Sequence, residues 1–99
     1  MPLDRLIHLN TKECLWIYIL SLLQKGGMHA YLIRKEIERT FGFSPGTMTA
    51  YKVLYLLHRK GYVSRKSLGR RNVYTLTPKG KQELVKASRY YRKLSDKLL

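Results

Sequence analysis

A cluster of basic side chains surrounds one glycine of the sequence. The cluster around Gly69 consists of Arg65, Lys66, Arg70, Arg71 and Asn72. Guanidinium and ammonium groups donate hydrogen bonds to phosphate oxygens, and arginine can do so through two parallel bonds. The chemistry that this segment offers is therefore the binding of a polyanion.

A second group of donors stands upstream, where a helix is expected to begin. Its members are Ser44, Thr47, Thr49 and Lys52, and Arg59 follows near the end of the same helix. The first N–H groups of a helix and the positive end of its dipole form a site for phosphate. Hydroxyls at such a place mainly position a protein on a nucleic-acid backbone, and Ser44 also has the role of a helix cap.

The charge of the whole chain agrees with these two groups. Twenty Lys and Arg face six Asp and Glu, which gives a net charge of +14 and a pI near 10.2. No acidic residue occurs between Arg39 and Gln82. A surface charged only for solubility, as in a protein from a hot or salty habitat, would mix the two signs. The distribution therefore favours a nucleic acid as the partner.

The first elements that must position these side chains are helical. Residues 1–9 form an N-terminal arm whose apolar residues suggest a turn of helix packed on the core. Asn10 with Glu13 resembles a capping box that opens the first clear helix. This helix is apolar nearly all round up to Leu23, which predicts a central buried helix, and Gly26 ends it.

A pair of helices follows. The first covers about residues 30–40; the second is expected to begin at Ser44-Pro45, with serine as cap and proline at the first position, and to end near Lys60. With Leu54 as the inward centre, the helical wheel turns Tyr51 inward.

A hairpin and a long helix complete the pattern. Residues 62–68 and 73–76 are β-type runs around a turn at 69–72, and Thr77-Pro78 begins a helix that reaches the C-terminus. Five residues of that helix are spaced as a coiled-coil seam, which predicts dimerisation, with packing on the same chain as the alternative. They are Leu84, Ala87, Tyr91, Leu94 and Leu98.

The expected fold is mainly α with a small β-hairpin (α+β), a winged helix-turn-helix. Residues 1–78 would be the DNA-binding domain with its arm, and residues 79–99 the C-terminal dimerisation helix, as one structural unit. The third helix would enter the major groove, and the basic wing would lie on the backbone or in the minor groove. The expected DNA contacts are Ser44, Thr47, Thr49, Tyr51, Lys52, Arg59, Arg65, Lys66, Arg70, Arg71 and Asn72.

The sequence resembles the PadR family of winged-helix transcription regulators from about residue 17 to residue 84. Residues 71–80 (RNVYTLTPKG) are similar to the family's R-x-x-Y-x-L-T-x-x-G, residues 28–31 (MHAY) to its M-H-G-Y, and residues 44–47 to its S-P-G-T. Three residues, instead of the usual one, separate Thr47 from Tyr51. The resemblance implies a DNA contact for Tyr51, whereas the helical wheel turns it inward, and both remain open.

The resemblance also implies a homodimer held by the C-terminal helix that binds an inverted repeat, often as a repressor. Many relatives sense small aromatic ligands near the dimer interface. Trp16, Tyr90 and Tyr91 would line such a pocket here, but the sequence favours core packing for them, and the spacing itself indicates no effector.

Other classes of function lack a sequence basis. The three histidines show no metal-ligand spacing and the six carboxylates no acid–base pair, so we expect no enzyme, no metal and no cofactor. Cys14 is the only cysteine, and the longest apolar stretch, residues 14–23, is too short to span a bilayer. No signal peptide is evident. These features predict a cytoplasmic, nucleoid-associated protein.

The sequence thus predicts a sequence-specific regulator that binds double-stranded DNA as a homodimer. An architectural, chromatin-type DNA binder with little specificity is the main alternative, since the charge suits both. A protein-interaction winged helix would not need a basic wing, and no stacking platform for RNA is evident.

Overall fold

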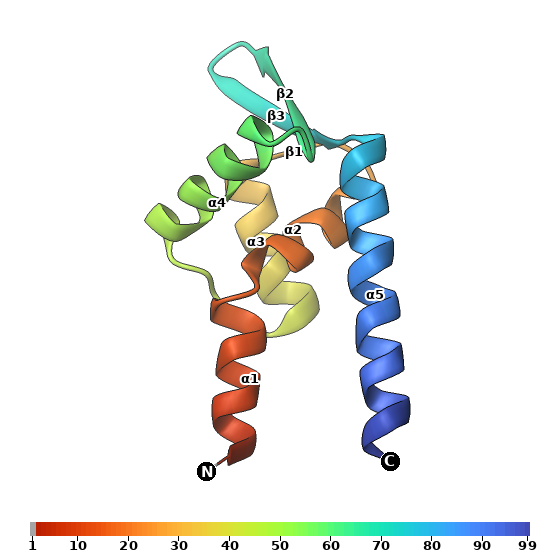
Figure 1. Cartoon of the computed structure of the whole chain (residues 1–99). Coiled ribbons are helices and arrows are strands. Elements are labelled where there is room, and N and C mark those ends of the chain that lie inside the picture. Colours follow the sequence, from red (N-terminus) through yellow and green to blue (C-terminus); the bar gives the residue numbers. More distant parts are fainter. Residues whose placement is uncertain (1) are drawn as a thin grey trace.

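The computed structural model describes residues 2–99, which form five helices and a small antiparallel sheet (Figure 1). This is the α+β class expected from the sequence. In chain order the elements are α1 (Pro2–Lys12), α2 (Leu15–Leu23), β1 (Met28–His29), α3 (Ala30–Phe41), α4 (Thr47–Arg59), β2 (Val63–Leu68), β3 (Arg71–Leu76) and α5 (Pro78–Leu98).

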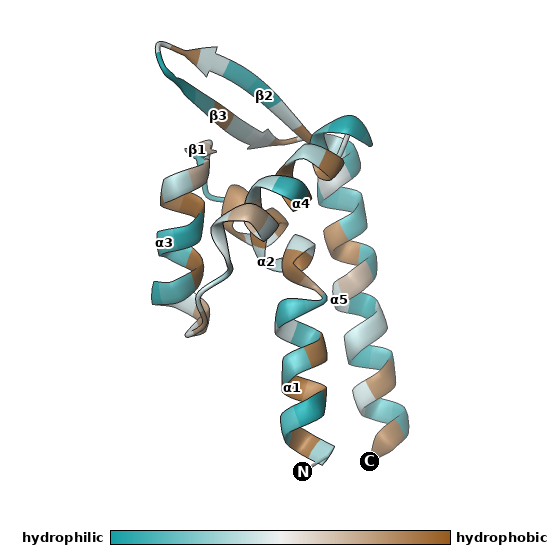
Figure 2. Ribbon diagram, turned by 90° about the vertical axis from the view of Figure 1, so that its left-hand side faces the viewer, coloured by the Kyte–Doolittle hydropathy of each residue, from teal (hydrophilic) through white to brown (hydrophobic). Residues whose placement is uncertain are grey.

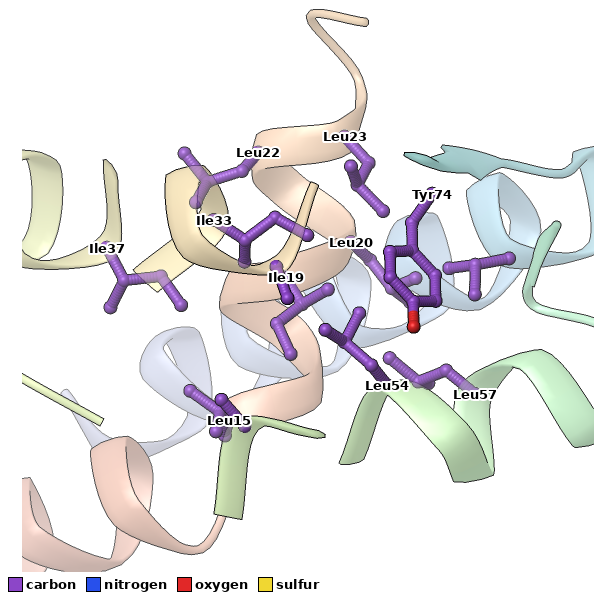
Figure 3. Close-up of a cluster of buried hydrophobic side chains, with 13 residues drawn as sticks. Leu15, Ile19, Leu20, Leu22, Leu23, Ile33, Ile37, Leu54, Leu57 and Tyr74 are labelled. Atoms are coloured by element: carbon purple, nitrogen blue, oxygen red, sulfur yellow. The ribbon is translucent and has the colours of Figure 1, made fainter. Parts of the chain in front are cut away.

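Helix α2 is the centre of the core, as its apolar sequence predicts. Five of its nine residues are buried, and α3, α4, α5 and the sheet all contact it. Figure 3 shows Ile19 and Leu20 of this helix beside Ile33 of α3 and Leu54 of α4. Full burial of one such side chain contributes about 1.5–3 kcal/mol, so this cluster supplies most of the stabilisation.

The first clear helix does not begin at Asn10, and the expected capping box is wrong. The chain forms a separate helix, α1, over the segment expected to be an arm, breaks at residues 13–14, and starts α2 at Leu15. The Asn10 side chain is engaged elsewhere: its Nδ2 donates to the carbonyl of Leu6 (2.9 Å) and its Oδ1 accepts from the Tyr91 hydroxyl (3.0 Å). An amide held in this way does not cap the next helix.

The second helix of the predicted pair does not begin at Ser44-Pro45 either. Helix α4 starts at Thr47 with Gly46 as its N-cap. Two basic side chains hold the preceding turn in place: Lys12 Nζ donates to the carbonyl of Ser44 (3.1 Å), and the Arg34 guanidinium donates to the carbonyl of Pro45 (3.3 Å). The carbonyl of Gly46 accepts from the N–H of Ala50 (2.9 Å) at the start of α4, whereas those of Ser44 and Pro45 accept from side chains, so the turn is longer than expected.

The sheet contains a strand that the sequence did not predict. Its order is β1-β3-β2, with β3 in the middle. Met28 pairs with Tyr74, and His29 pairs with Val73. The hairpin turn is tighter than expected, because Leu68 pairs with Arg71 and only two residues, led by Gly69 with φ +63°, connect the strands. Glycine at the first central position is typical of a type II′ turn, which suits the twist of a hairpin.

A close contact fixes the hairpin to α5. The side chain of Thr77 accepts from the Gly80 N–H (3.1 Å) and donates to the carbonyl of Gly61 (2.7 Å). Gly80 is buried, and a Cβ on it would overlap the carbonyl oxygen of Tyr62 and lie 2.8 Å from Leu76. Only glycine fits here, and this close approach explains why the L-T-P-K-G segment ends in glycine.

Beyond this contact, α5 runs away from the sheet. Figures 1 and 2 show α1 and α5 side by side, with the free ends of both pointing away from the hairpin. The bond from Tyr91 to Asn10 joins them. Burial raises the pKa of the Tyr91 hydroxyl, since the ionised form is disfavoured in the contact.

We expect Gly80→Ala to lower the free energy of unfolding by about 1–3 kcal/mol, the usual cost of forcing a methyl group into a packed site. Urea denaturation followed by circular dichroism measures this change. Helix propensity alone would give the opposite sign, a gain of about 1 kcal/mol. A more stable variant would therefore contradict the close approach to Tyr62. Ser88→Ala, on the exposed part of α5, is the control that should change little.

Candidate nucleic-acid interface

The outward face of α4 is exposed over its whole length. Thr47, Thr49, Lys52 and Arg59 lie on it, whereas Ala50, Leu54 and Leu57 form the buried face. The prediction that Tyr51 points inward is wrong: its side chain is 51% exposed. The buried face is centred toward Ala50 and Leu57 rather than on Leu54, which turns Tyr51 out.

The wing carries the cluster of side chains around Gly69. All five predicted wing residues are exposed, and they lie on β2, on β3 and in the turn between these strands: Arg65, Lys66, Arg70, Arg71 and Asn72. The Ser67 hydroxyl donates to Asn72 Oδ1 (3.0 Å), which holds the amide of Asn72 on the hairpin. Figure 1 places the hairpin next to the C-terminal end of α4.

One pocket lies where α4 meets the wing. It has a volume of about 270 Å³, and Tyr51 of α4 lies in its wall with Arg70, Arg71 and Asn72 of the wing. The remaining wall includes His29, Ala30, Tyr31 and Tyr74. Ser44 lies elsewhere, in a hollow of about 300 Å³ beside α3. Of the predicted contacts, the structure thus joins Tyr51 to the end of the wing and leaves Ser44 apart.

The cations of α4 and the wing have no acidic partner within residues 2–99. The ion pairs in this part of the chain are Arg39–Glu36 (2.6 Å) and Lys86–Glu83 (3.7 Å), on α3 and α5. Hydrogen bonds from Arg39 hold the pKa of the Glu36 carboxyl below its usual range. Glu36 and Glu83 are therefore engaged by other cations. Because no carboxylate of residues 2–99 pairs with a cation of α4 or the wing, the positive charge of the wing remains available to an external anion.

Three residues of this surface were not predicted as contacts. Met48 is 84% exposed in the first turn of α4, Tyr31 is 59% exposed at the start of α3, and His29 lies in the pocket wall. The M-H-A-Y segment was the signal in the sequence for His29 and Tyr31. Because strand β1 was not predicted, the sequence did not place this segment beside the wing. Met48 gave no signal, because an apolar residue near a helix start predicts core.

The predicted dimer seam divides into two parts. Leu84 and Ala87 are half-buried, and Leu84 packs against the core of its own chain. Tyr91, Leu94 and Leu98 are exposed by 39, 40 and 71%. Packing on the same chain thus accounts for Leu84 and, through the bond to Asn10, for part of Tyr91, whereas Leu94 and Leu98 stay exposed.

Helix α1 adds an apolar stripe of its own. Leu3, Leu6 and Ile7 follow one another at helical spacing and are 64, 56 and 53% exposed. Because α1 lies alongside α5, the two stripes belong to the same end of the molecule (Figure 2).

The aromatic residues considered for an effector do not share one pocket. Trp16 lines a hollow of about 290 Å³ together with α4 residues, Tyr62 and Glu83. Tyr90 and Tyr91 pack edge to face on α5 and are not part of its wall. Over residues 2–99, no helix combines the length and the apolar character that crossing a membrane requires.

Comparison with known proteins gives a consistent result. The model of the "Transcriptional regulator PadR-like family" matches residues 19–86. Among solved structures, a transcriptional regulator from Clostridium thermocellum is similar with a TM-score of 0.77 and 25% identity, over 84% of each chain. A PadR family transcription regulator from Clostridium difficile has a TM-score of 0.75 and 25% identity, over 82% of this chain and 90% of that one.

A third structure is a complex with DNA. Bacillus subtilis PadR in complex with operator DNA has a TM-score of 0.68 and 30% identity, over 74% of this chain and 46% of that chain. No curated protein matches the sequence.

Proposed function

Since the chain belongs to the PadR-like family of transcriptional regulators, we propose that it binds double-stranded DNA as a sequence-specific homodimer and represses transcription. The observation that carries this proposal is the meeting of α4 and the basic wing at one pocket, with no carboxylate paired to their cations within residues 2–99. The complex of the Bacillus subtilis relative with operator DNA supports the choice of ligand. The place of action would be the nucleoid.

Helix α4 would lie in the major groove with its N-terminal end foremost. Thr47, Thr49 and Lys52 stand on its exposed face, where hydroxyl and ammonium groups meet base edges or phosphates. Met48, 84% exposed, adds an apolar side chain to this face, and such a side chain fits the methyl group of thymine. Ser44, in the preceding turn, and Arg59, at the far end of α4, would bind the flanking backbone.

The wing would hold the neighbouring backbone or the minor groove. Arg65 and Lys66 lie on β2, and Arg70 and Arg71 lie at the turn, all exposed. Arginine is the residue that a narrow minor groove attracts most readily, and it also binds phosphates through two bonds. These contacts would add affinity for any duplex and leave sequence reading to α4.

The homodimer would form through α5 with the help of α1. An apolar surface is exposed at one end of the molecule. It consists of Tyr91, Leu94 and Leu98 on α5 and of Leu6 and Ile7 on α1. A second copy of the chain would bury both stripes in one two-fold interface, as isologous dimers do. Two copies related in this way would present two α4 helices to two half-sites of an inverted repeat.

Selection of duplexes from a random library tests the function. We expect enrichment of an inverted repeat that is bound at least about a thousandfold more tightly than scrambled DNA, the lower range for specific binders. Duplex binding without any enriched sequence would contradict specific regulation and favour the architectural alternative. Absence of duplex binding would contradict the whole proposal.

Charged substitutions in the proposed seam test the dimer interface. Tyr91→Lys with Leu94→Lys places two ammonium groups in the proposed seam, and we expect a monomer by light scattering with strongly weakened DNA binding. Gln82→Lys with Asp96→Lys adds positive charge to the opposite face of α5 and should leave the dimer intact. A monomeric wild-type protein would defeat the proposed interface.

A further inference from the structure

The side chain of His29 stands between two hydrogen-bond donors. The N–H of Leu32 donates to its Nδ1 (3.3 Å), which makes His29 the N-cap of α3. On the other side of the ring, Nη1 of Arg71 lies 3.1 Å from Nε2. The two contacts come from different elements, because Leu32 belongs to α3 and Arg71 to β3.

These two contacts make opposite demands on the imidazole. A neutral imidazole has one nitrogen that donates and one that accepts, whereas a guanidinium only donates. A neutral ring whose Nδ1 accepts from Leu32 carries its proton on Nε2 and cannot also accept from Arg71. The Nε2–H of His29 and the N–H groups of Arg71 are then two donors that face the same space without an acceptor between them.

The surroundings hold the ring in this position. Tyr31 stacks on the His29 ring with an interplanar angle of 13° and a centroid distance of 6.4 Å, and Lys35 Nζ lies 5.5 Å from the centroid of Tyr31. The backbone of His29 pairs with Val73 in the sheet. The ring is therefore fixed from three sides, so it cannot easily turn to relieve the opposition of donors.

The open side faces the pocket that α4 shares with the wing. His29 and Arg71 both lie in its wall, Arg70 adds a second guanidinium, and Tyr51 and Tyr31 line it as well. The pocket wall contains no carboxylate. An oxygen that accepts from both donors and carries negative charge would satisfy the arrangement, and a non-bridging phosphate oxygen has both properties.

We propose that His29 and Arg71 form a phosphate-binding site, in which the Nε2–H of His29 and the guanidinium of Arg71 donate to one oxygen of the DNA backbone. The inference rests on the proposed function, because the phosphate belongs to the duplex that α4 and the wing bind. The site lies where these two elements meet, so it fixes the angle between the recognition helix and the wing on the DNA. His29 positions the protein and reads no base.

The ring proton can be located without DNA. Long-range ¹H–¹⁵N correlation spectra of the free protein distinguish the two tautomers of His29. We expect the proton on Nε2. A proton on Nδ1 would mean that Nε2 accepts from Arg71, and the site with two donors would not exist.

The contribution to binding is tested by His29→Asn. Asparagine is a good N-cap and can still accept from Leu32, but its side chain is too short to replace the Nε2–H. With a short fluorescein-labelled duplex of scrambled sequence, we expect about a hundredfold weaker binding, because each subunit of the dimer loses one hydrogen bond to a charged oxygen and each loss costs about tenfold. Ser88→Ala, on the exposed part of α5, should bind like the wild type.

Arg71→Gln provides the second arm. It should weaken binding about tenfold for each subunit and so about a hundredfold for the dimer. The slope of log affinity against log salt should become shallower by about 1.8, which is about 0.9 for the one phosphate of each subunit. His29→Asn should leave the slope unchanged, because in the proposed site the ring donates a hydrogen bond without adding a cation. Arg89→Gln, which removes the same charge from the face of α5 opposite the seam, is the matched control. Because both donors share one oxygen, the double variant should lose less than the product of the two single losses.

The outcomes separate the two proposals. If the wild type binds the duplex and His29→Asn binds it equally well, this site is overturned and the proposed function stays intact. If the wild type binds no duplex, both are overturned. Inorganic phosphate at matched ionic strength should move the ring resonances only at far higher concentration than the duplex does. If it moves them at lower concentration, the site serves a free anion and the assignment to DNA is wrong.

Discussion

Positive charge without a nearby negative partner is the constraint on which the rest of this structure depends. Between Arg39 and Gln82 the chain has no carboxylate, and within residues 2–99 no cation of α4 or the wing forms an ion pair. Like charges held on one surface repel each other and oppose the compact state. The apolar core around α2 and the close contact of Gly80 with Tyr62 must therefore hold the charged elements in place. A polyanion that lies against this surface relieves the repulsion, and the relief contributes to the free energy of binding.

Strand β3 connects the charged surface to the core. It pairs with β2 on one side and with β1 on the other, so the wing is continuous with the start of α3. Tyr74 of β3 is buried in the core, while Arg71 of the same strand reaches the pocket that Tyr51 lines. The distance between wing and α4 is thus set by a sheet and a core rather than by a flexible loop. A rigid relation between the two elements is what a fixed register on DNA requires.

The sequence predicted most of the fold, because its strongest patterns are local. The apolar run of α2, the Thr77 cap and the β-type runs around Gly69 all correspond to elements of the structure. The errors arose where tertiary contacts decide. Lys12 and Arg34 bind the carbonyls of Ser44 and Pro45 and delay the start of α4, and Asn10 bonds to Tyr91 instead of capping α2. The pairing of β1 with β3 spans more than 40 residues of chain, so the meeting of His29 with Arg71 could not be predicted from spacing.

The salt dependence of DNA binding by the wild-type protein tests the central claim most directly. If each half-site neutralises about four phosphates, a dimer engages about eight, and log affinity should fall with log salt at a slope of about −7. Removing two wing cations with Arg70→Ala and Arg71→Ala should make that slope distinctly shallower. A wild-type slope shallower than about −3 would contradict the account, because the cations of α4 and the wing would then not lie against the phosphates of a duplex.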